Sequence, residues 1–507
     1  MHKNLKAGAA VSYLYIATHV ISNFLYAPIL LAAVGDAEYG LYQLIGSLYS
    51  YIAVFESSMS AGILKYYCEA KNSGNAQRQA ETLAVGRRMY RVLSGITAAA
   101  GCASILLFRL FYQSSFTGYE LQSGSIMLAL LFVNLIAVME NGIYLAGLQA
   151  DEEFVFIKAL SILQEVLQPC VCWILLKRYP HAVTAVAVQL GLSLFVILIR
   201  WLYADKKLGI RPAAKYRNKT MERAVLAFSG GILAAQIADQ IFWKADQLIL
   251  GKYYGTAVVA VYAIGSQIYT NYMYTATPVA SVFFPRLSRM AGGQNGPKQM
   301  SDLFIKVGRI AFTLSWLVLT AFLLIGRDFI RLWVGNGFEE AYVVALIVMI
   351  PFTIDIIQNL GLSILQVTNQ YGFRAKMYLT AALLNVVSTA VMAKFWGMYG
   401  AALSTGITML LTSGFIMNWF YQTKAGLNIQ SFWKNIGSIA LKTSPVFLTG
   451  VLIRSAVGSL SAGAFLLFAI GYTAAYGLWM YAFAADEYEK QLMQKAVRKV
   501  LRKGEKS

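Results

Sequence analysis

Apolar stretches recur along the whole chain, separated by short segments that carry charged residues, Gly, Pro or Asn. An apolar stretch longer than about 18 residues can cross the hydrocarbon core of a bilayer as a helix. Fourteen such helices are predicted, centred near residues 20, 52, 100, 137, 166, 193, 236, 270, 316, 354, 385, 410, 446 and 473. The pattern therefore predicts an all-α integral membrane protein with about 14 transmembrane helices.

Composition agrees with this prediction, because 58% of the 507 residues are hydrophobic and only 13% are charged. The charged share is roughly half that of an average soluble domain, which excludes a soluble globular protein. The formal net charge of +19 would suggest a nucleic-acid partner in a soluble protein. Here 34 of the 43 Lys and Arg fall on one side of the predicted spans, and the segments that join spans 2 and 3, 6 and 7, and 8 and 9 are especially rich in them. We therefore expect these segments to face the cytoplasm, both termini to lie on that side, and no nucleic acid to bind.

Residues for enzyme chemistry are sparse in this sequence. Four Cys lack the spacing of a zinc site or a disulfide framework, and the chain has three His. The sequence also lacks the Gly-rich loop, followed by a Lys and a Ser or Thr, that binds phosphate in ATPases, so it does not predict ATP hydrolysis. The loops are too short to fold into catalytic domains. We therefore expect no metal site, no enzyme activity and no cofactor other than Na⁺ or H⁺ as a coupling ion.

A weak internal repeat suggests two related bundles. Gly35–Tyr49 resembles Gly255–Tyr269, and both segments lie at a predicted outer hairpin, between spans 1 and 2 and between spans 7 and 8. Five further segments are informative through their order and spacing: Pro28–Tyr42, Asp246–Gly251, Pro285–Arg289, Phe329–Gly335 and Gly397–Thr405. Together they resemble the polysaccharide and oligosaccharide flippases of the MATE-like (multidrug/oligosaccharidyl-lipid/polysaccharide exporter) superfamily, over nearly the whole chain.

The resemblance implies two six-helix lobes in a pseudo-symmetric V around a central cavity that opens alternately to either side. The lobes would comprise residues 1–220 (spans 1–6) and 221–425 (spans 7–12), followed by spans 13–14 in 426–485. Residues 486–507 read as a basic amphipathic cytoplasmic tail. The implied function is translocation of a polyprenyl-pyrophosphate-linked oligosaccharide across the bacterial cytoplasmic membrane for cell-surface polysaccharide synthesis. Membrane lipids and a glycan polymerase or other polysaccharide-assembly proteins are the implied partners.

Ionisable residues inside the spans are the first candidates for a substrate site, because each costs about 2.5–3.5 kcal/mol to insert. Span 7 is the richest, with Asp239 and Asp246 on one helical face and Lys244 on another. Lys244 shares its face with Gln240 and Gln247, and we predict that this face meets the cavity and a phosphate-bearing substrate. In the alternative, Lys244 pairs with Glu56 of span 2 or Asp355 of span 10, which are also candidate cavity residues, and only fixes packing.

Span 8 and the start of span 3 offer further candidate contacts. The rings of Tyr269 and Tyr272 suit stacking on sugars, and the amide of Asn271 suits binding hydroxyls, although interfacial belts also explain many tyrosines. At the cytoplasmic mouth, Arg87, Arg88 and Arg91 are candidate first contacts for the substrate, or ordinary topology charges.

A cation site is implied by the resemblance to lipid II flippases, in which an acidic residue of span 7 joins polar groups of spans 11 and 12 to bind sodium. Asp246 matches the acidic residue, and Asn385, Thr389 and Thr405 occupy the matching polar positions. Asp239 lies on the same face of span 7 as Asp246. Thr389 replaces a second carboxylate of that pattern, which leaves proton or potential coupling open.

Other functions remain open at this stage. Glu56, Asp239 and Asp355 are compatible with an ion-coupled drug exporter of the same superfamily, which needs an acidic cavity for organic cations. A lipid II flippase is a further alternative, but span 1 lacks the arginines that line the cavity of that family. A glycan polymerase or ligase would require catalytic residues in an outer loop.

Overall fold

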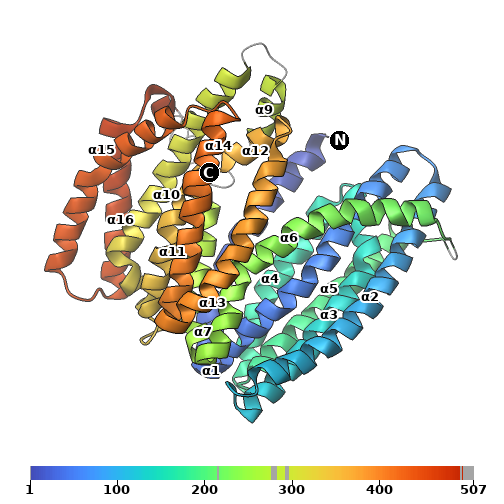
Figure 1. The fold of residues 1–507 in the computed structure, drawn as a ribbon. Helices are drawn as coiled ribbons and strands as arrows, with labels where there is room; N and C mark the ends of the chain where they lie inside the picture. The colour runs from blue at the N-terminus through green and yellow to red at the C-terminus, as the bar shows by residue number, and fades with distance from the viewer. Residues whose placement is uncertain (1, 214–215, 276–282, 292–295, 492–493, 495–507) are drawn as a thin grey trace, which may run out of the picture. The chain divides into compact units, whose positions relative to one another are not determined.

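The computed structural model describes residues 2–213, 216–275, 283–291, 296–491 and 494. Within these ranges the regular elements are all helices, and the longest are shown in Figure 1. The first part of the chain contains α1 (His2–Asn72), α2 (Ala76–Tyr112), α3 (Gly118–Ala150), α4 (Phe154–Leu176), α5 (Ala182–Lys206), α6 (Lys219–Tyr254) and α7 (Thr256–Tyr272). The second part contains α9 (Phe284–Ala291), α10 (Gly296–Val334), α11 (Glu340–Ile357), α12 (Asn359–Val367), α13 (Tyr371–Met409), α14 (Met417–Thr423), α15 (Ile429–Ala456) and α16 (Ala462–Trp479). Short 3₁₀ or π segments, Met273–Thr275, Leu410–Ile416 and Met480–Ala484, extend α7, α13 and α16.

The described residues include 11 continuous helical segments that are long and apolar enough to cross a membrane. Two of these segments each contain two predicted spans, and α7, with 17 residues, matches the predicted span 8. These observations confirm an all-α, multi-pass membrane protein with about 14 spans. α1 and α13 each hold two spans because each consists of two helices joined at a sharp kink.

Glycine produces both kinks. Gly35 has a φ of 79° inside α1, and Gly397 has a φ of 57° inside α13. Only glycine adopts such positive φ values at little cost, because it has no Cβ to clash with the backbone. The predicted boundaries between spans 1 and 2 and between spans 11 and 12 coincide with these two residues.

The chain divides into two compact units. Unit 1 consists of residues 1–263 and 389–398, and unit 2 of residues 264–388 and 399–507. Helix α6 groups with unit 1, whereas the sequence division assigned residues from 221 onward to the second lobe. Its packing along α1 explains this grouping. Most of the predicted basic tail, residues 492–493 and 495–507, lies outside the described residues.

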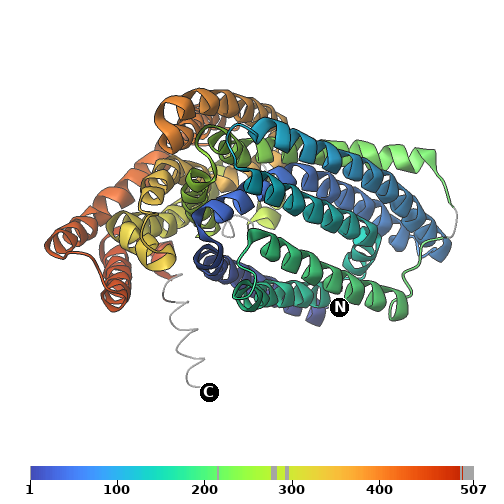
Figure 2. The same cartoon turned by 90° about the horizontal axis from the view of Figure 1, so that it is seen from below.

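In unit 1, α1 packs against α3, α4 and α6, and α3 packs against α2 and α5. Figures 1 and 2 show α2 and α3 running side by side. The apolar core contains Ile63, Tyr90, Met139 and Ile143, from α1, α2 and α3. Burial of these side chains holds α1 in place, and α1 in turn supports the polar residues of α6.

In unit 2, α10 is the central helix and packs against α11, α15 and α16, while α9 and α12 lie against its first turns and each other. The rings of Phe304 and Phe432 stack with a centroid distance of 4.8 Å, and Tyr421 packs on Phe304 at 5.7 Å. These aromatic contacts join α10 to α14 and α15, so the helices after residue 417 belong to the same core.

Replacing Gly40 with alanine is expected to destabilise unit 1 by about 1–3 kcal/mol. A methyl group at this position would overlap the backbone carbonyl of Thr256, at the start of α7, and backbone atoms cannot rotate away. Thermal unfolding of the detergent-purified protein measures the effect. Gly46→Ala is the matched control, because a methyl group there meets no atom within 4 Å. Equal melting temperatures for the two variants would contradict this close helix approach.

Candidate functional site

Asp246 is the most buried acidic side chain of α6, with 1% of its surface exposed. The hydroxyl of Tyr262, on α7, donates a hydrogen bond to its Oδ2. The Thr389 hydroxyl, on α13, donates to its Oδ1 at 3.0 Å. All three residues belong to unit 1, so the structure brings the predicted residues Asp246 and Thr389 together and adds Tyr262.

The donor set around Asp246 suits a hard cation. Carboxylate and hydroxyl oxygens are the ligands that such ions prefer. The same carboxylate can take up a proton, because a buried charge in a bilayer is costly. Among the described residues, no group of three or more His, Cys, Asp or Glu gathers as a metal site would require.

Asn385 organises a second polar cluster, within unit 2. It is fully buried, its Nδ2 donates to Thr405 Oγ1 at 3.1 Å, and its Oδ1 accepts from Ser404 Oγ at 2.9 Å. The predicted pair Asn385 and Thr405 is therefore in direct contact. These bonds join the halves of α13 on either side of the Gly397 kink.

Lys244 lies on the opposite side of α6 from the aspartates. Its side chain is half-buried, and within the described part of the chain it forms neither a hydrogen bond nor an ion pair. Gln240, one turn earlier, is also half-buried. An ammonium group at this depth without a protein anion is expensive to maintain, so it marks a position that water or an anion reaches.

Gln247 shares the helical face of Lys244, and Glu56 and Asp355 are its two candidate partners; within the described residues, none of the three bonds to Lys244. Gln247 is buried and accepts a hydrogen bond from Ser47 on α1. Glu56 is half-buried on α1 and forms no ion pair with Lys244. Asp355 of α11 pairs with Arg374 at 3.3 Å and accepts a hydrogen bond from Ser413 at 2.8 Å. Asp355 is therefore part of the internal packing of unit 2.

The remaining candidates lie in different settings. Tyr269 is buried, and the Tyr272 hydroxyl contacts Thr353 Oγ1 at 2.8 Å, whereas Asn271 donates to the Gln267 carbonyl at 2.8 Å. Asp239 is exposed on α6. Sugar contact by these residues remains a prediction.

The three arginines lie within the first half of α2. Arg87 donates to the Tyr144 hydroxyl at 3.5 Å, Arg88 pairs with Glu222 of α6 at 3.6 Å, and Arg91 is exposed. Of the three, Arg91 is therefore the most accessible for a first contact with a substrate.

Sequence reasoning missed two buried ion-pair centres of unit 2. Arg309 of α10 pairs with Glu489 at 2.8 Å. Asp328 of α10 pairs with both Arg331 and Arg454. Arg309 and Glu489 are separated by 180 residues, so no local sequence pattern predicts that they pair. The sequence feature that could have pointed to these ion pairs is the presence of ionisable residues near the ends of spans.

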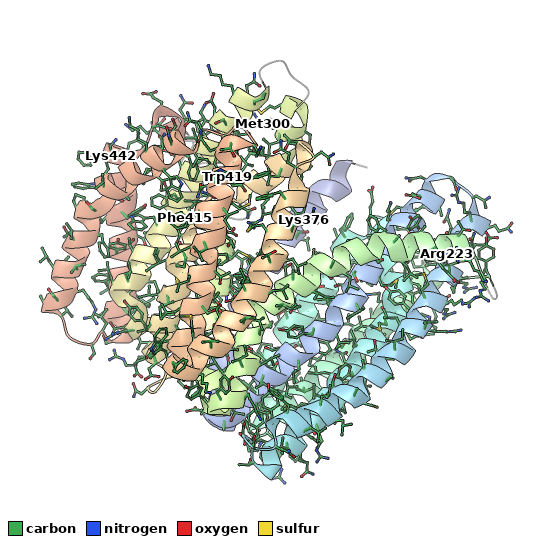
Figure 3. The ribbon with its side chains drawn as sticks, viewed as in Figure 1. Arg223, Met300, Lys376, Phe415, Trp419 and Lys442 are labelled. Carbon is green, nitrogen blue, oxygen red and sulfur yellow. The ribbon has the colours of Figure 1, made fainter. Side chains whose placement is uncertain are left out.

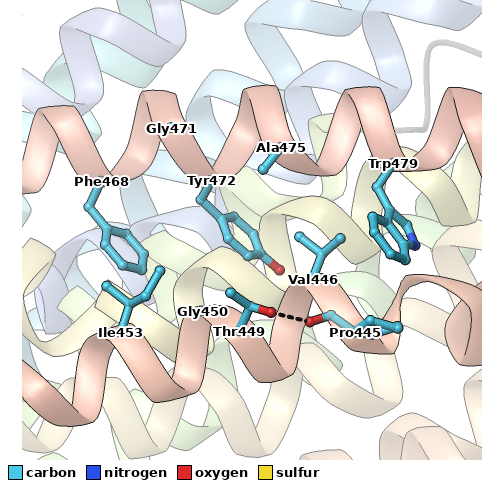
Figure 4. A pocket seen from close by; sticks show the side chains of 10 residues that line it. All are labelled: Pro445, Val446, Thr449, Gly450, Ile453, Phe468, Gly471, Tyr472, Ala475 and Trp479. Atoms are coloured by element: carbon cyan, nitrogen blue, oxygen red, sulfur yellow. Dashed lines mark hydrogen bonds between the residues drawn. The ribbon is translucent and has the colours of Figure 1, made fainter.

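An apolar groove lies between α15 and α16 in unit 2 (Figure 4). Its volume is about 390 Å³, and Figure 4 shows Ile453 of α15 facing Phe468 and Tyr472 of α16. Its wall also includes Pro445, Val446, Thr449, Gly450, Gly471, Ala475 and Trp479. The Thr449 hydroxyl is bonded to the Pro445 carbonyl at 2.8 Å, which leaves an apolar lining suited to a hydrocarbon chain.

Comparisons with known proteins agree with this architecture. The family described as "Polysaccharide biosynthesis protein" matches residues 34–343. The amylovoran biosynthesis protein AmsL of Erwinia amylovora is 20% identical over 329 residues, which cover 63% of this chain and 82% of AmsL.

Solved structures share the fold. The lipid II flippase MurJ in an inward closed conformation has a TM-score of 0.72 and 12% identity, covering 93% of this chain and 97% of MurJ. An inward-facing multidrug resistance MATE transporter of the MOP superfamily has a TM-score of 0.68 and 11% identity, covering 82% of this chain and 96% of the transporter. The expected superfamily fold is therefore confirmed.

Proposed function

Because this chain belongs to the polysaccharide biosynthesis protein family, we propose that it is a flippase for a polyprenyl-pyrophosphate-linked oligosaccharide. It moves this glycolipid from the cytoplasmic to the outer leaflet of the cytoplasmic membrane of a bacterium, for assembly of a cell-surface polysaccharide. The family match carries the proposal, and the fold shared with a lipid II flippase supports it. The step is transport, with no covalent bond made or broken.

In this proposal Lys244 attracts the pyrophosphate. The group carries several negative oxygens, and a lysine ammonium binds phosphate as a compact point charge. Gln240, on the same face of α6, adds an amide donor next to it. Arg87, Arg88 and Arg91 at the cytoplasmic mouth raise the local concentration of the anionic headgroup, and Arg91 meets it first because it is exposed.

The polyprenyl chain remains in an apolar environment throughout the transfer. The groove between α15 and α16 provides this environment, since its lining is almost entirely aliphatic and aromatic. While this groove holds the polyprenyl chain, the pyrophosphate and the glycan pass through the central cavity, which opens alternately to either side. Asn271, which is partly exposed, is the proposed sugar contact on span 8, whereas Tyr269 and Tyr272 are buried in this structure.

Coupling in this proposal resides at Asp246. A bound Na⁺ or H⁺ supplies a positive charge that neutralises the carboxylate. Asp246, Tyr262 and Thr389 supply oxygen atoms that fit either ion. Asn385 and Thr405 are the proposed further polar groups for coupling, and they bond to each other within unit 2. Asp239, on the same helix, is the second acidic group proposed to bind the coupling ion. Both termini lie on the cytoplasmic side, as the distribution of Lys and Arg predicts.

A drug exporter is the second candidate, supported by the fold shared with a multidrug transporter. An exporter of organic cations needs accessible carboxylates, whereas Asp355 is engaged by Arg374 and the half-buried Lys244 would repel cationic drugs. The charge of α6 therefore favours an anionic substrate.

Binding to the purified protein distinguishes the two candidates. We expect a short-chain polyprenyl-pyrophosphate glycan to bind more tightly than tetraphenylphosphonium, and an excess of inorganic pyrophosphate to weaken the glycolipid complex. Native mass spectrometry in detergent measures both. Preferential binding of tetraphenylphosphonium, with no effect of pyrophosphate, would replace the flippase proposal with the exporter.

A further inference from the structure

A polar cavity of about 410 Å³ lies in unit 2, at the end of α10 where α9 and the segment after α16 meet it. Two cationic side chains from two helices line this cavity, Arg286 of α9 and Lys306 of α10. Gln299, Asp302 and Tyr488 are its other polar residues. The cavity is separate from the α15–α16 groove, because no residue lines both.

The packing of α9 fixes the position of Arg286. Leu287 is fully buried, and α9 contacts α10 and α12. Arg286, the residue before Leu287, is exposed and lines the cavity. The buried Leu287 therefore anchors α9 on its neighbours and holds Arg286 at the cavity.

A buried ion pair fixes the wall formed by Tyr488. Arg309, three residues after Lys306, bonds Glu489 twice, with Nε–Oε1 at 2.9 Å and Nη2–Oε2 at 2.8 Å. Asn435 of α15 accepts a third bond from Arg309 at 3.0 Å. Breaking a buried pair leaves an uncompensated charge and is strongly destabilising. The segment that carries Tyr488 is therefore held against α10, with Lys306 Nζ 5.9 Å from the Tyr488 ring centre.

The two cations of the cavity are available to a ligand. Within the described ranges, neither Arg286 nor Lys306 forms an ion pair, and Asp302 pairs with no base. The lining therefore carries one net positive charge. Arg presents a planar fork to phosphate oxygens, Lys a point charge, and the Gln299 amide and Tyr488 hydroxyl add hydrogen-bond donors. This combination suits a phosphate group.

We propose that this cavity is a binding site for the phosphate headgroup of an anionic membrane phospholipid. The loop between spans 8 and 9 lies on the side where the positive charge of the chain predicts the cytoplasm, and basic pockets between helices on that side bind acidic headgroups. The cavity is also lined by the apolar residues Phe283, Met290, Leu303 and Val307, so a lipid satisfies both its charged and its apolar walls. The site does not depend on the transported substrate.

The full-length protein in detergent tests this proposal with three probes: dioctanoyl phosphatidylglycerol, dioctanoyl phosphatidylcholine and inorganic phosphate. We expect phosphatidylglycerol to bind most tightly and to raise the melting temperature, because a ligand that binds the folded state stabilises it. The double variant Arg286→Gln/Lys306→Gln is expected to lose about fivefold in affinity for each charge removed. Equal affinity for the two lipids in the unsubstituted protein would overturn the proposal.

A charge-matched control separates the site from the general surface potential. Arg223→Gln/Lys424→Gln removes two exposed charges outside the cavity, and Figure 3 shows Arg223 on α6. We expect this control to bind phosphatidylglycerol as the unsubstituted protein does. An equal loss in both double variants would contradict a defined site. Binding of inorganic phosphate as tight as that of the lipid would assign the cavity to a free anion.

Asp302 reports which kind of headgroup binds. Asp302→Asn removes the one acidic group among the described lining residues and is expected to strengthen phosphatidylglycerol binding severalfold, because the carboxylate repels the phosphate. Weaker binding in this variant would contradict an anionic headgroup.

Discussion

Lys244→Ala is expected to lower transport of a polyprenyl-pyrophosphate glycan about 10- to 100-fold, the loss that follows removal of a charge-assisted hydrogen bond. Lys244→Arg is expected to retain most of the activity, because a guanidinium also binds phosphate. Initial rates of translocation in proteoliposomes measure both variants. The reason for the large effect is the position of the lysine, half-buried within a membrane-spanning helix and without a protein anion among the described residues.

The control for this experiment is another lysine of the same helix. Lys219 is the first residue of α6, is exposed, and forms no ion pair in the part of the chain that the structure describes. Lys219→Ala should transport at nearly the unsubstituted rate. Unchanged transport in Lys244→Ala would remove Lys244 from the substrate site, and equal losses in both lysine variants would point to a general effect of charge.

Asp246→Asn is expected to lower transport at least about tenfold and to remove its dependence on an imposed Na⁺ or H⁺ gradient. Asparagine has nearly the shape of aspartate but only one carbonyl oxygen, so it accepts from one of the Tyr262 and Thr389 hydroxyls and its amide group faces the other. The change therefore removes the negative charge and one acceptor. Transport rates with and without each gradient, measured in the same proteoliposomes, test this expectation. They also identify the ion.

Two further variants separate coupling from packing at Asp246. Thr389→Val removes one donor and keeps the carboxylate, so gradient dependence should persist with a shifted ion requirement. Asp205→Asn is the control, because Asp205 pairs with the exposed Arg211 at the end of α5. If Asp246→Asn lowers the melting temperature but leaves gradient dependence intact, Asp246 is a packing residue and coupling resides elsewhere.

The span pattern was predictable because it is a local property. The predicted boundaries between spans 1 and 2 and between spans 11 and 12 coincide with Gly35 and Gly397, whose positive φ values bend the chain. Because the backbone angles of Gly35 and Gly397 are not helical, α1 and α13 each consist of two helices joined at a kink, one for each predicted span.

The site was predictable only in part. Helical periodicity separates the Lys244 face of α6 from the aspartate face, and the family resemblance places Thr389 near Asp246, where the structure finds it. The partner of Asp355 was not predictable, because Arg374 reaches it only once α11 and α13 are packed. The same holds for Tyr488, whose place beside Lys306 depends on the distant pair Arg309 and Glu489.

Translocation by the purified, unsubstituted protein tests the central claim most directly. A fluorescent polyprenyl-pyrophosphate oligosaccharide is placed in proteoliposomes, and its exposure in the opposite leaflet is followed with a membrane-impermeant quencher. We predict rapid protein-dependent translocation of the glycolipid and no comparable export of tetraphenylphosphonium. Folded protein that leaves the glycolipid in its original leaflet, while exporting the organic cation, would contradict the flippase assignment.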